Sequence, residues 1–146
     1  MEFRRLTIAD IEPVAAFAVE GMRPHLYPAQ RLSVDKVRAV VRHFHDTAGD
    51  FHLLAFDAGR LVAAMAATLQ ESLFFERCEA HLLMCRAVVP GAAPQMFTAL
   101  RTWFEREPRA RRMTWPQEFD AGPGMTRLMR RYGFKQCITT CVHYKD

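Results

Sequence analysis

Apolar and polar residues recur along this chain with two periods, and each change of period marks a new element. Alternation with a period of two predicts a short strand at residues 3–6. Further strands are predicted at 51–56, 61–69, 111–115 and 134–144, and an apolar run predicts another at 80–89. The turn Asp57-Ala58-Gly59-Arg60 contains a glycine that can adopt the positive φ of a tight hairpin. A β-hairpin is therefore expected over residues 51–69.

Four other segments repeat their apolar residues at helical spacing. The first begins at Ile8 behind the capping residue Thr7 and ends near Gly21, and the second follows Ser33 and closes before residue 49. The third ends near residue 107 and the fourth at Gly133. The residues expected to face the core are Ile8, Ile11, Val14, Ala15, Ala18 and Met22, then Val34, Val37, Val40, Val41 and Phe44, then Met96, Phe97, Leu100, Trp103 and Phe104, and finally Met125, Leu128, Met129 and Tyr132.

Prolines and glycines predict irregular backbone at 23–28 and a break at 121–124. The resulting order is β, α, α, β, β, β, α, β, α, β. It predicts a protein of the α/β (α+β) class, with a mixed, mostly antiparallel sheet and helices on both faces. A chain of 146 residues with 50% hydrophobic residues fits one domain over residues 1–146.

The net charge of +4 comes almost entirely from arginine, which is concentrated in the last third of the chain. Arginine binds phosphate and carboxylate groups well, although a solvated helix face explains the same pattern. Aromatic residues are not interleaved with the arginines as in RNA-binding modules, so nucleic acid is not the expected partner.

No window approaches the roughly 18 apolar residues of a membrane span, and no apolar h-region follows the first residues. We therefore expect a soluble, cytoplasmic protein that does not insert into a membrane. The cysteines lack the C-x-x-C spacing of a zinc site and lie in apolar runs, so reduced thiols are expected; they are Cys78, Cys85, Cys137 and Cys141. His43 and His45 fall on different helix faces, which argues against a shared metal ion.

The stretch from Glu79 to Glu107 has a strand, a loop with Pro90, Gly91 and Pro94, and a helix. Such a junction is where many proteins hold phosphate groups, because the first turn of a helix leaves N–H groups unpaired and aligned with the helix dipole.

The order of elements, with three local pieces, resembles the GNAT superfamily of acyl-CoA N-acyltransferases. The pieces are Arg127-Leu128-Met129-Arg130-Arg131-Tyr132-Gly133-Phe134, the opening Leu6-Thr7-Ile8-Ala9-Asp10, and Ala87-Val88-Val89-Pro90. The resemblance covers nearly the whole chain. It implies acetyl-CoA as cosubstrate, an amine of a small molecule or protein as acceptor, and no metal. A homodimer through sheet edges or the last strand is compatible with it.

The resemblance places the pantetheine of acetyl-CoA on the backbone of Ala87, Val88 and Val89. It places the pyrophosphate on the following loop, and the matching residues are Gly91, Ala92, Ala93 and Gln95. This loop departs from the family pattern, because it has no arginine and no second glycine, and Pro94 deletes one N–H donor.

Catalytic groups also differ from the family. The family's acidic tyrosine corresponds to Met129, which cannot donate a proton, and Tyr132 is the candidate substitute. The positions of the general base hold Met84 and Leu82. Glu79 and His81 lie on the opposite strand parity and become candidate bases if a β-bulge shifts the register.

Two functions remain open from the sequence. The first is a diverged acetyltransferase that uses Glu79, His81 or Tyr132. The second is a GNAT-fold binding, regulatory or structural protein that has lost acetyl-CoA chemistry, with its arginines facing an acidic partner. By the same resemblance, the segment 23–27 lies on the acceptor side, and Trp115 borders the same cleft or packs in the core.

Overall fold

A computed structural model describes residues 1–26, 31–72, 76–115 and 122–135. Its middle layer is a five-stranded sheet in the order β1-β2-β3-β4-β5. The strands are β1 (Glu2–Arg4), β2 (Phe51–Asp57), β3 (Arg60–Glu71), β4 (Cys78–Ala87) and β5 (Ala110–Thr114). All neighbouring strands are antiparallel except β4 and β5, which are parallel. The predicted mixed, mostly antiparallel sheet is confirmed.

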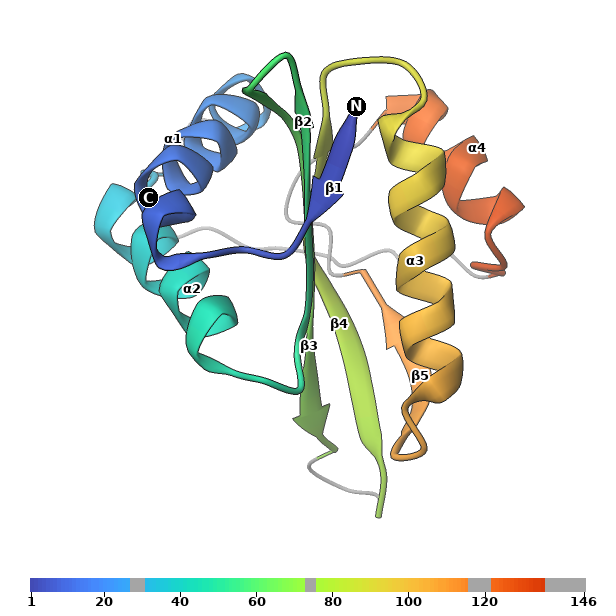
Figure 1. Ribbon diagram of the computed structural model, residues 1–146. Helices are drawn as coiled ribbons and strands as arrows, with labels where there is room; N and C mark the ends of the chain where they lie inside the picture. Colours follow the sequence, from blue (N-terminus) through green and yellow to red (C-terminus); the bar gives the residue numbers. More distant parts are fainter. Residues whose placement is uncertain (27–30, 73–75, 116–121, 136–146) are drawn as a thin grey trace, which may run out of the picture.

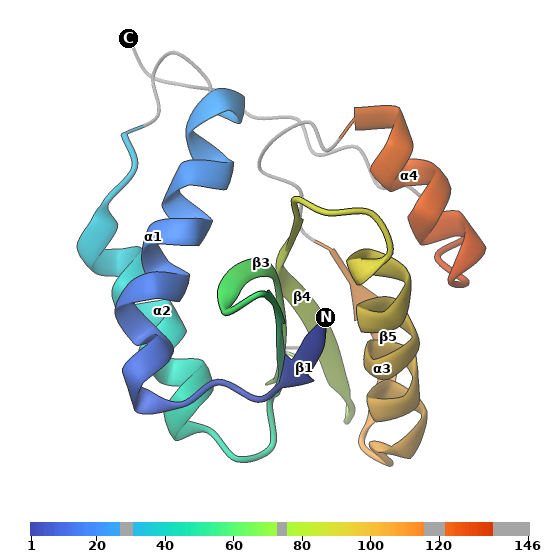
Figure 2. The same cartoon turned by 45° about the horizontal axis from the view of Figure 1, so that its top comes forward.

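Helices cover both faces of this sheet. α1 (Ile11–Met22) and α2 (Val34–Asp46) lie on one face, and α3 (Ala92–Arg106) and α4 (Gly122–Arg131) lie on the other (Figures 1 and 2). Two short 3-10 helices, η1 (Ile8–Asp10) and η2 (Arg23–His25), flank α1. Within the described ranges, no helix is long and apolar enough to cross a membrane.

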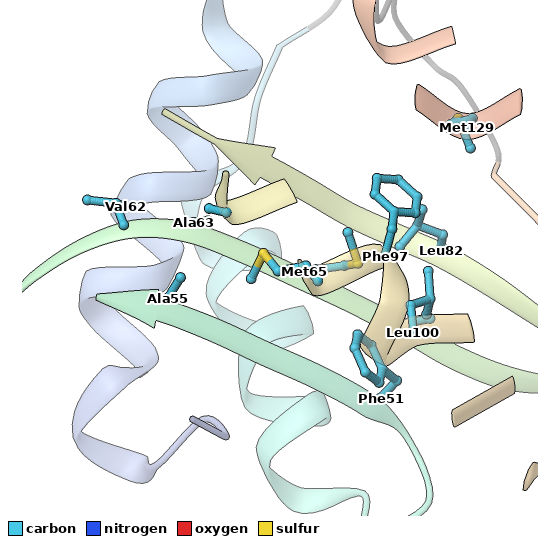
Figure 3. Packing of buried hydrophobic residues seen from close by; sticks show 12 residues of the cluster. Phe51, Ala55, Val62, Ala63, Met65, Leu82, Phe97, Leu100 and Met129 are labelled. Carbon is cyan, nitrogen blue, oxygen red and sulfur yellow. The ribbon is translucent and has the colours of Figure 1, made fainter. Parts of the chain in front are cut away.

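β3 is the central strand, and its small apolar side chains are divided between two cores. Ala63, Met65 and Ala67 face α3 and α4, where they pack with Leu82 and other residues. Figure 3 shows Phe97 and Leu100 lying near Leu82 and Phe51, with Met129 coming from α4. Ala64 and Ala66 face α1 and α2 and pack with Ile11, Val14, Val41 and Phe44. A strand covered on both faces reads as a continuous apolar run, which is what residues 61–69 show.

Three residues expected in the core are exposed. Ile8 is 68% exposed because it lies in η1, ahead of the α-helix that begins at Ile11. Val34 and Val40 are 42% and 45% exposed, since α2 packs mainly through Val41 and Phe44. The amphipathic stripe of α2 is therefore narrower than its sequence predicts.

Two segments expected to be irregular are partly helical. Arg23–His25 forms η2, and Pro24 is tolerated because it occupies one of the first helical positions, where an N–H is not needed. The expected break at 121–124 was also wrong for residues 122–124, because α4 begins at Gly122. The observed β4 begins and ends two residues earlier than expected. Most of the expected strand at 134–144 lies outside the described residues, and Phe134 and Lys135 are not in a strand.

Candidate functional site

β4 and β5 are paired only along the first part of β4. Their parallel pairing runs from Cys78–Ala110 to His81–Thr114, and β5 ends at Thr114. β4 continues to Ala87 without a described strand on that side. We call this opening beyond His81 the β4–β5 split.

The split exposes alternate backbone groups of β4. Val88 donates its N–H to the carbonyl oxygen of Val62 at 2.9 Å, so its main chain is directed toward β3. In an antiparallel ladder, neighbouring residues direct their N–H and C=O groups to opposite sides. Ala87, the last residue of β4, therefore directs its groups into the split, while Val88 presents a side chain that is 54% exposed.

The N-terminus of α3 follows this segment directly. Its N-cap residue Gly91 has φ +87°, a left-handed conformation that costs an L-residue with a side chain about 1–2 kcal/mol. The first-turn N–H groups of Gly91, Ala92 and Ala93 have no partner within the helix, and Pro94 has no N–H. By the helical pattern, Gln95 donates its own N–H to the carbonyl of Gly91, so Gln95 offers only its exposed side chain. The loop thus presents three N–H donors.

A β-bulge in β4 sets which side chains face the helices. Ala66 pairs with Met84 but the next residue, Ala67, pairs with Leu82, which leaves Leu83 as the extra residue. The bulge reverses the side-chain alternation. Leu82 consequently packs in the core beneath α3, whereas Met84 packs on the α1 and α2 side. His81, opposite Thr68, lies on the same side as Met84. The bulge on which the candidacy of Glu79 and His81 depended is therefore present.

His81 stands at the point where the split begins. Its Nδ1 is 2.9 Å from the hydroxyl of Thr114, the last residue of β5. This pair joins the two strands at the last rung of their ladder. No partner of Nε2 is found in the described part of the chain.

Glu79 lies two rungs further from the split and is paired with cations. Its Oε1 is 3.3 Å from Nη2 of Arg77 and 3.8 Å from Nη1 of Arg112, and its side chain is 17% exposed. Both oxygen–nitrogen contacts are ion pairs, so the carboxylate is engaged by two guanidinium groups.

Tyr132 ties the end of α4 to the first turn of α3. Its hydroxyl donates to the carbonyl oxygen of Pro94 at 2.9 Å, and its ring stacks on Phe97 with centroids 5.2 Å apart. The side chain of Met129 is buried, at 8% exposure, in the core beneath α3 and α4.

Arg86 is a site residue that sequence reasoning missed. It donates to the carbonyl of Phe17, lies 3.0 Å from Glu20 and places its guanidinium 4.1 Å from the ring centroid of Phe17. A Cβ at Gly21 would lie 2.6 Å from Cδ of Arg86, so a larger residue there would displace the arginine side chain from its present position. An arginine inside an otherwise apolar strand was the available signal. The contact fixes the C-terminal end of α1 against the split segment of β4.

Other candidates have structural roles. Burial raises the pKa of the Cys85 thiol to about 12, so Cys85 is a poor nucleophile, and Cys78 is also a free thiol. Trp115 packs against the core on the α3 side. His43 pairs with Asp50 and His45 with Asp46, and no group of three metal-ligating residues occurs in the part of the chain described. Cys137 and Cys141 lie outside the described residues.

Arginines line an open groove of about 870 Å³ between α3, β5 and the end of α4, and Arg112, Thr114 and Tyr132 of the candidate site also line it. Its cationic residues are Arg77, Arg101, Arg111, Arg112, Arg130 and Lys135, and no acidic residue is among the described residues that line it. We call it the arginine groove.

Comparison with known proteins gives a consistent answer from structure alone. No protein-family model and no curated protein sequence matches the chain. Among solved structures, a possible acetyltransferase from Clostridium difficile 630 has a TM-score of 0.73 at 12% identity, covering 99% of this chain and 97% of that one. The aminoglycoside N-acetyltransferase AAC(6')-Iy in complex with CoA has a TM-score of 0.66 at 13% identity, covering 99% of both chains.

A transcriptional regulator from Bacillus halodurans C-125 is similar too, with a TM-score of 0.67 at 18% identity over 98% of this chain and 99% of that one. Identities this low establish architecture and leave the chemistry to be argued from the residues. The mixed sheet, its split at β4 and β5, and these full-length structural matches show that the chain has the GNAT acyltransferase fold.

Proposed function

We propose that this protein is an N-acetyltransferase that transfers an acetyl group from acetyl-CoA to the amine of a small molecule or protein. The observation that carries the proposal is the β4–β5 split, which leads directly into the N-terminus of α3. One end of this path supplies hydrogen-bonding backbone for an extended amide chain. The other end supplies N–H donors and a positive helix dipole for phosphate groups.

The residues present fit acetyl-CoA in part. Ala87 directs its backbone groups into the split, and we assign the pantetheine amides to Ala87, Val88 and Val89. Gly91, Ala92 and Ala93 suit the pyrophosphate, because their small size lets oxygen approach the N–H groups closely. Gln95 adds a neutral side-chain donor. The set has one donor fewer than a first turn without proline, so we expect weak to moderate affinity.

The bound thioester supplies an activated acetyl group, and the protein's own task is to position the amine and remove its proton. We assign the proton-accepting role to Nε2 of His81, which has no described protein partner and lies where the split begins. Glu79, held by Arg77 and Arg112, places a carboxylate on the same face as His81, where it favours the positive charge that His81 gains when it takes the proton. The Tyr132 hydroxyl donates to the carbonyl of Pro94. We therefore assign Tyr132 to holding the first turn of α3 in place rather than to proton donation.

The acceptor is proposed from the neighbours' chemistry. Some structural neighbours are aminoglycoside acetyltransferases, which act on amines of small molecules. A small-molecule amine entering from the α1 and η2 side would meet His81 on the same face of the sheet as Met84 and Arg86. Use of acetyl-CoA, together with the free thiols of Cys78 and Cys85, fits a cytoplasmic location.

A second candidate function is binding of an acidic partner without acetyl transfer. The arginine groove favours it, and so does Pro94, which removes one N–H donor from the start of α3. On this alternative, the GNAT fold has lost acetyl transfer and binds an acidic partner through the groove. The similar structure named as a transcriptional regulator shows that this architecture is also used in a protein named for regulation. This alternative predicts that acetyl-CoA does not bind.

Thermal denaturation with and without acetyl-CoA separates the two functions. At a ligand concentration of about 100 times Kd, the free energy of unfolding rises by about 2.7 kcal/mol, which raises Tm by several degrees. If 1 mM acetyl-CoA produces no shift, the acetyltransferase proposal fails. If a shift is seen, release of the CoA thiol should then be measured over a panel of amines at pH 8. The negative control is His81→Gln, which should bind acetyl-CoA with unchanged affinity and lose turnover.

A further inference from the structure

The pairing of His81 with Thr114 has a consequence for the ring of His81. A neutral imidazole carries one proton, either on Nδ1 or on Nε2, and the hydrogen bond made by one nitrogen selects the form. Nδ1 is 2.9 Å from the Thr114 hydroxyl, and no described residue pairs with Nε2. Only the form protonated at Nδ1 leaves a lone pair on Nε2 with which to accept a proton.

We propose that Thr114 is a positioning residue: its hydroxyl oxygen accepts the Nδ1–H of His81, which fixes the ring and leaves Nε2 as the proton acceptor. This inference rests on the proposed function for its catalytic meaning, but the hydrogen bond itself does not. When an ammonium group is presented, one N–H proton passes to Nε2. The neutral amine keeps its electron pair, and the imidazolium holds a proton on each nitrogen.

The position of Thr114 in the fold makes it suited to this role. It is the last residue of β5, directly opposite His81 in the final rung before the split. The residue after Thr114 is no longer paired with β4, so Thr114 is the last β5 residue that the strand pairing holds beside β4. The pair is partly buried, which limits competition from water for the hydrogen bond.

The surroundings of the pair contain few other groups that could hold the ring. On the same face, β3 contributes the neutral Thr68 opposite His81 and Gln70 opposite Glu79. The charged groups that β4 and β5 contribute to this face are Glu79, Arg86 and Arg112. Glu79 pairs with Arg112 at 3.8 Å, and Arg86 is held by Phe17 and Glu20 of α1. Thr114 is therefore the described residue that selects the proton position on His81.

The direct test is nitrogen NMR on protein labelled with ¹⁵N-histidine. Spectra at neutral and alkaline pH report which ring nitrogen carries the proton, and His81→Gln identifies the signals. We expect the form protonated at Nδ1 to dominate in the native chain. In Thr114→Val the ratio of the two forms should change about fivefold, the factor that corresponds to one hydrogen bond of ~1 kcal/mol. Thr114→Ser should restore the native ratio.

A native spectrum with the proton on Nε2, or a ratio unchanged in Thr114→Val, would overturn the proposal. Circular dichroism and Tm establish that each variant is folded, and Thr114→Ser keeps the test open if Thr114→Val does not fold. This result does not depend on acetyl-CoA, so the pairing can be sustained even if the proposed function fails. If turnover is found, Thr114→Val should lower kcat about fivefold or more with KM for acetyl-CoA unchanged, and Thr114→Ser should restore kcat.

Discussion

The hydroxyl of Tyr132 donates a hydrogen bond to the carbonyl oxygen of Pro94 at 2.9 Å, which ties the last helix to the first turn of α3. The same oxygen also accepts from the Thr98 hydroxyl at 3.0 Å, so it keeps one partner if Tyr132 is changed. The tyrosine nearest the family's catalytic position thus supports the first turn of α3, to which we assign the pyrophosphate.

Replacing Tyr132 by Phe should lower the free energy of unfolding by only about 0.5–1 kcal/mol, because Pro94 retains Thr98 and the ring still stacks on Phe97. Urea denaturation measures this change. Tyr132→Leu is the matched variant and should cost about 1 kcal/mol more, since it also loses the aromatic contact. A fall in kcat of a hundredfold or more in Tyr132→Phe, at unchanged stability, would instead identify Tyr132 as an acid.

Replacing Gln95 by Glu should weaken acetyl-CoA binding about tenfold. The new carboxylate would stand in the first turn of α3, beside the N–H groups of Ala92 and Ala93 to which we assign the pyrophosphate. Calorimetric titration with acetyl-CoA measures the loss. Thr102→Glu provides the control, because its exposed carboxylate lies two turns further along α3, about 10 Å away, and is screened. Equal affinity in native protein and Gln95→Glu would show that the phosphates bind elsewhere.

Patterns within one element were predictable from the sequence, and relationships between elements were not. The hairpin over residues 51–69 could be predicted because the turn and the flanking apolar residues act locally. The bulge at Leu83 could not, because Leu82-Leu83-Met84 reads as an even apolar run whichever residue is extra. That single extra residue decides whether His81 faces α1 or α3.

The same limit explains the missing site residues. The pairing of Arg86 with Phe17 and Gly21 and that of His81 with Thr114 join positions tens of residues apart, and nothing in the sequence around each residue points to its partner. Gly91 could be placed in the loop between strand and helix because glycine is a local signal of such a loop, and its φ of +87° is what the structure adds.

Replacing Asp10 by Asn should destabilise the protein by about 2–3 kcal/mol. Both carboxylate oxygens accept from Arg4, at 2.7 and 2.8 Å, and one also accepts from the N–H and hydroxyl of Thr7. The Arg4 hydrogen bonds hold the pKa of Asp10 well below its usual range, so this stabilisation is complete at neutral pH and is lost only as the pH falls below about 4. Asp35→Asn, at a 91% exposed side chain, should change stability by less than about 0.5 kcal/mol. Equal urea midpoints for the two variants would contradict the assignment.

Replacing Ala58 by Asn should stabilise the hairpin. Ala58 and Gly59 have φ of +47° and +76°, and they form a two-residue turn between the paired Asp57 and Arg60. This is the type I′ geometry that favours Asn-Gly, and alanine is strained in it. We expect a gain of about 0.5–1 kcal/mol by thermal or urea denaturation. Ala48→Asn, at an exposed loop position with negative φ, should give no gain. A stabilisation common to both variants would show that turn strain is not the cause.

Replacing His52 by Asn should remove a loss of stability between pH 6.5 and 4. His52 is 7% exposed, and its Nδ1 accepts from the N–H of Leu6 at 3.0 Å while Nε2 lies 2.9 Å from Nη2 of Arg5. Burial first, and then the charge of Arg5, lowers the pKa of His52 from 6.5 to about 4. Between these pH values the unfolded chain binds a proton at His52 and the native chain does not. The free energy of unfolding of the native protein should therefore fall by roughly 2 kcal/mol as the pH falls through this window. In His52→Asn the amide oxygen can accept from Leu6 without titrating, so the urea midpoint should be nearly constant from pH 6.5 to 4.5. Parallel losses in the native protein and the variant would assign the acid sensitivity to other groups.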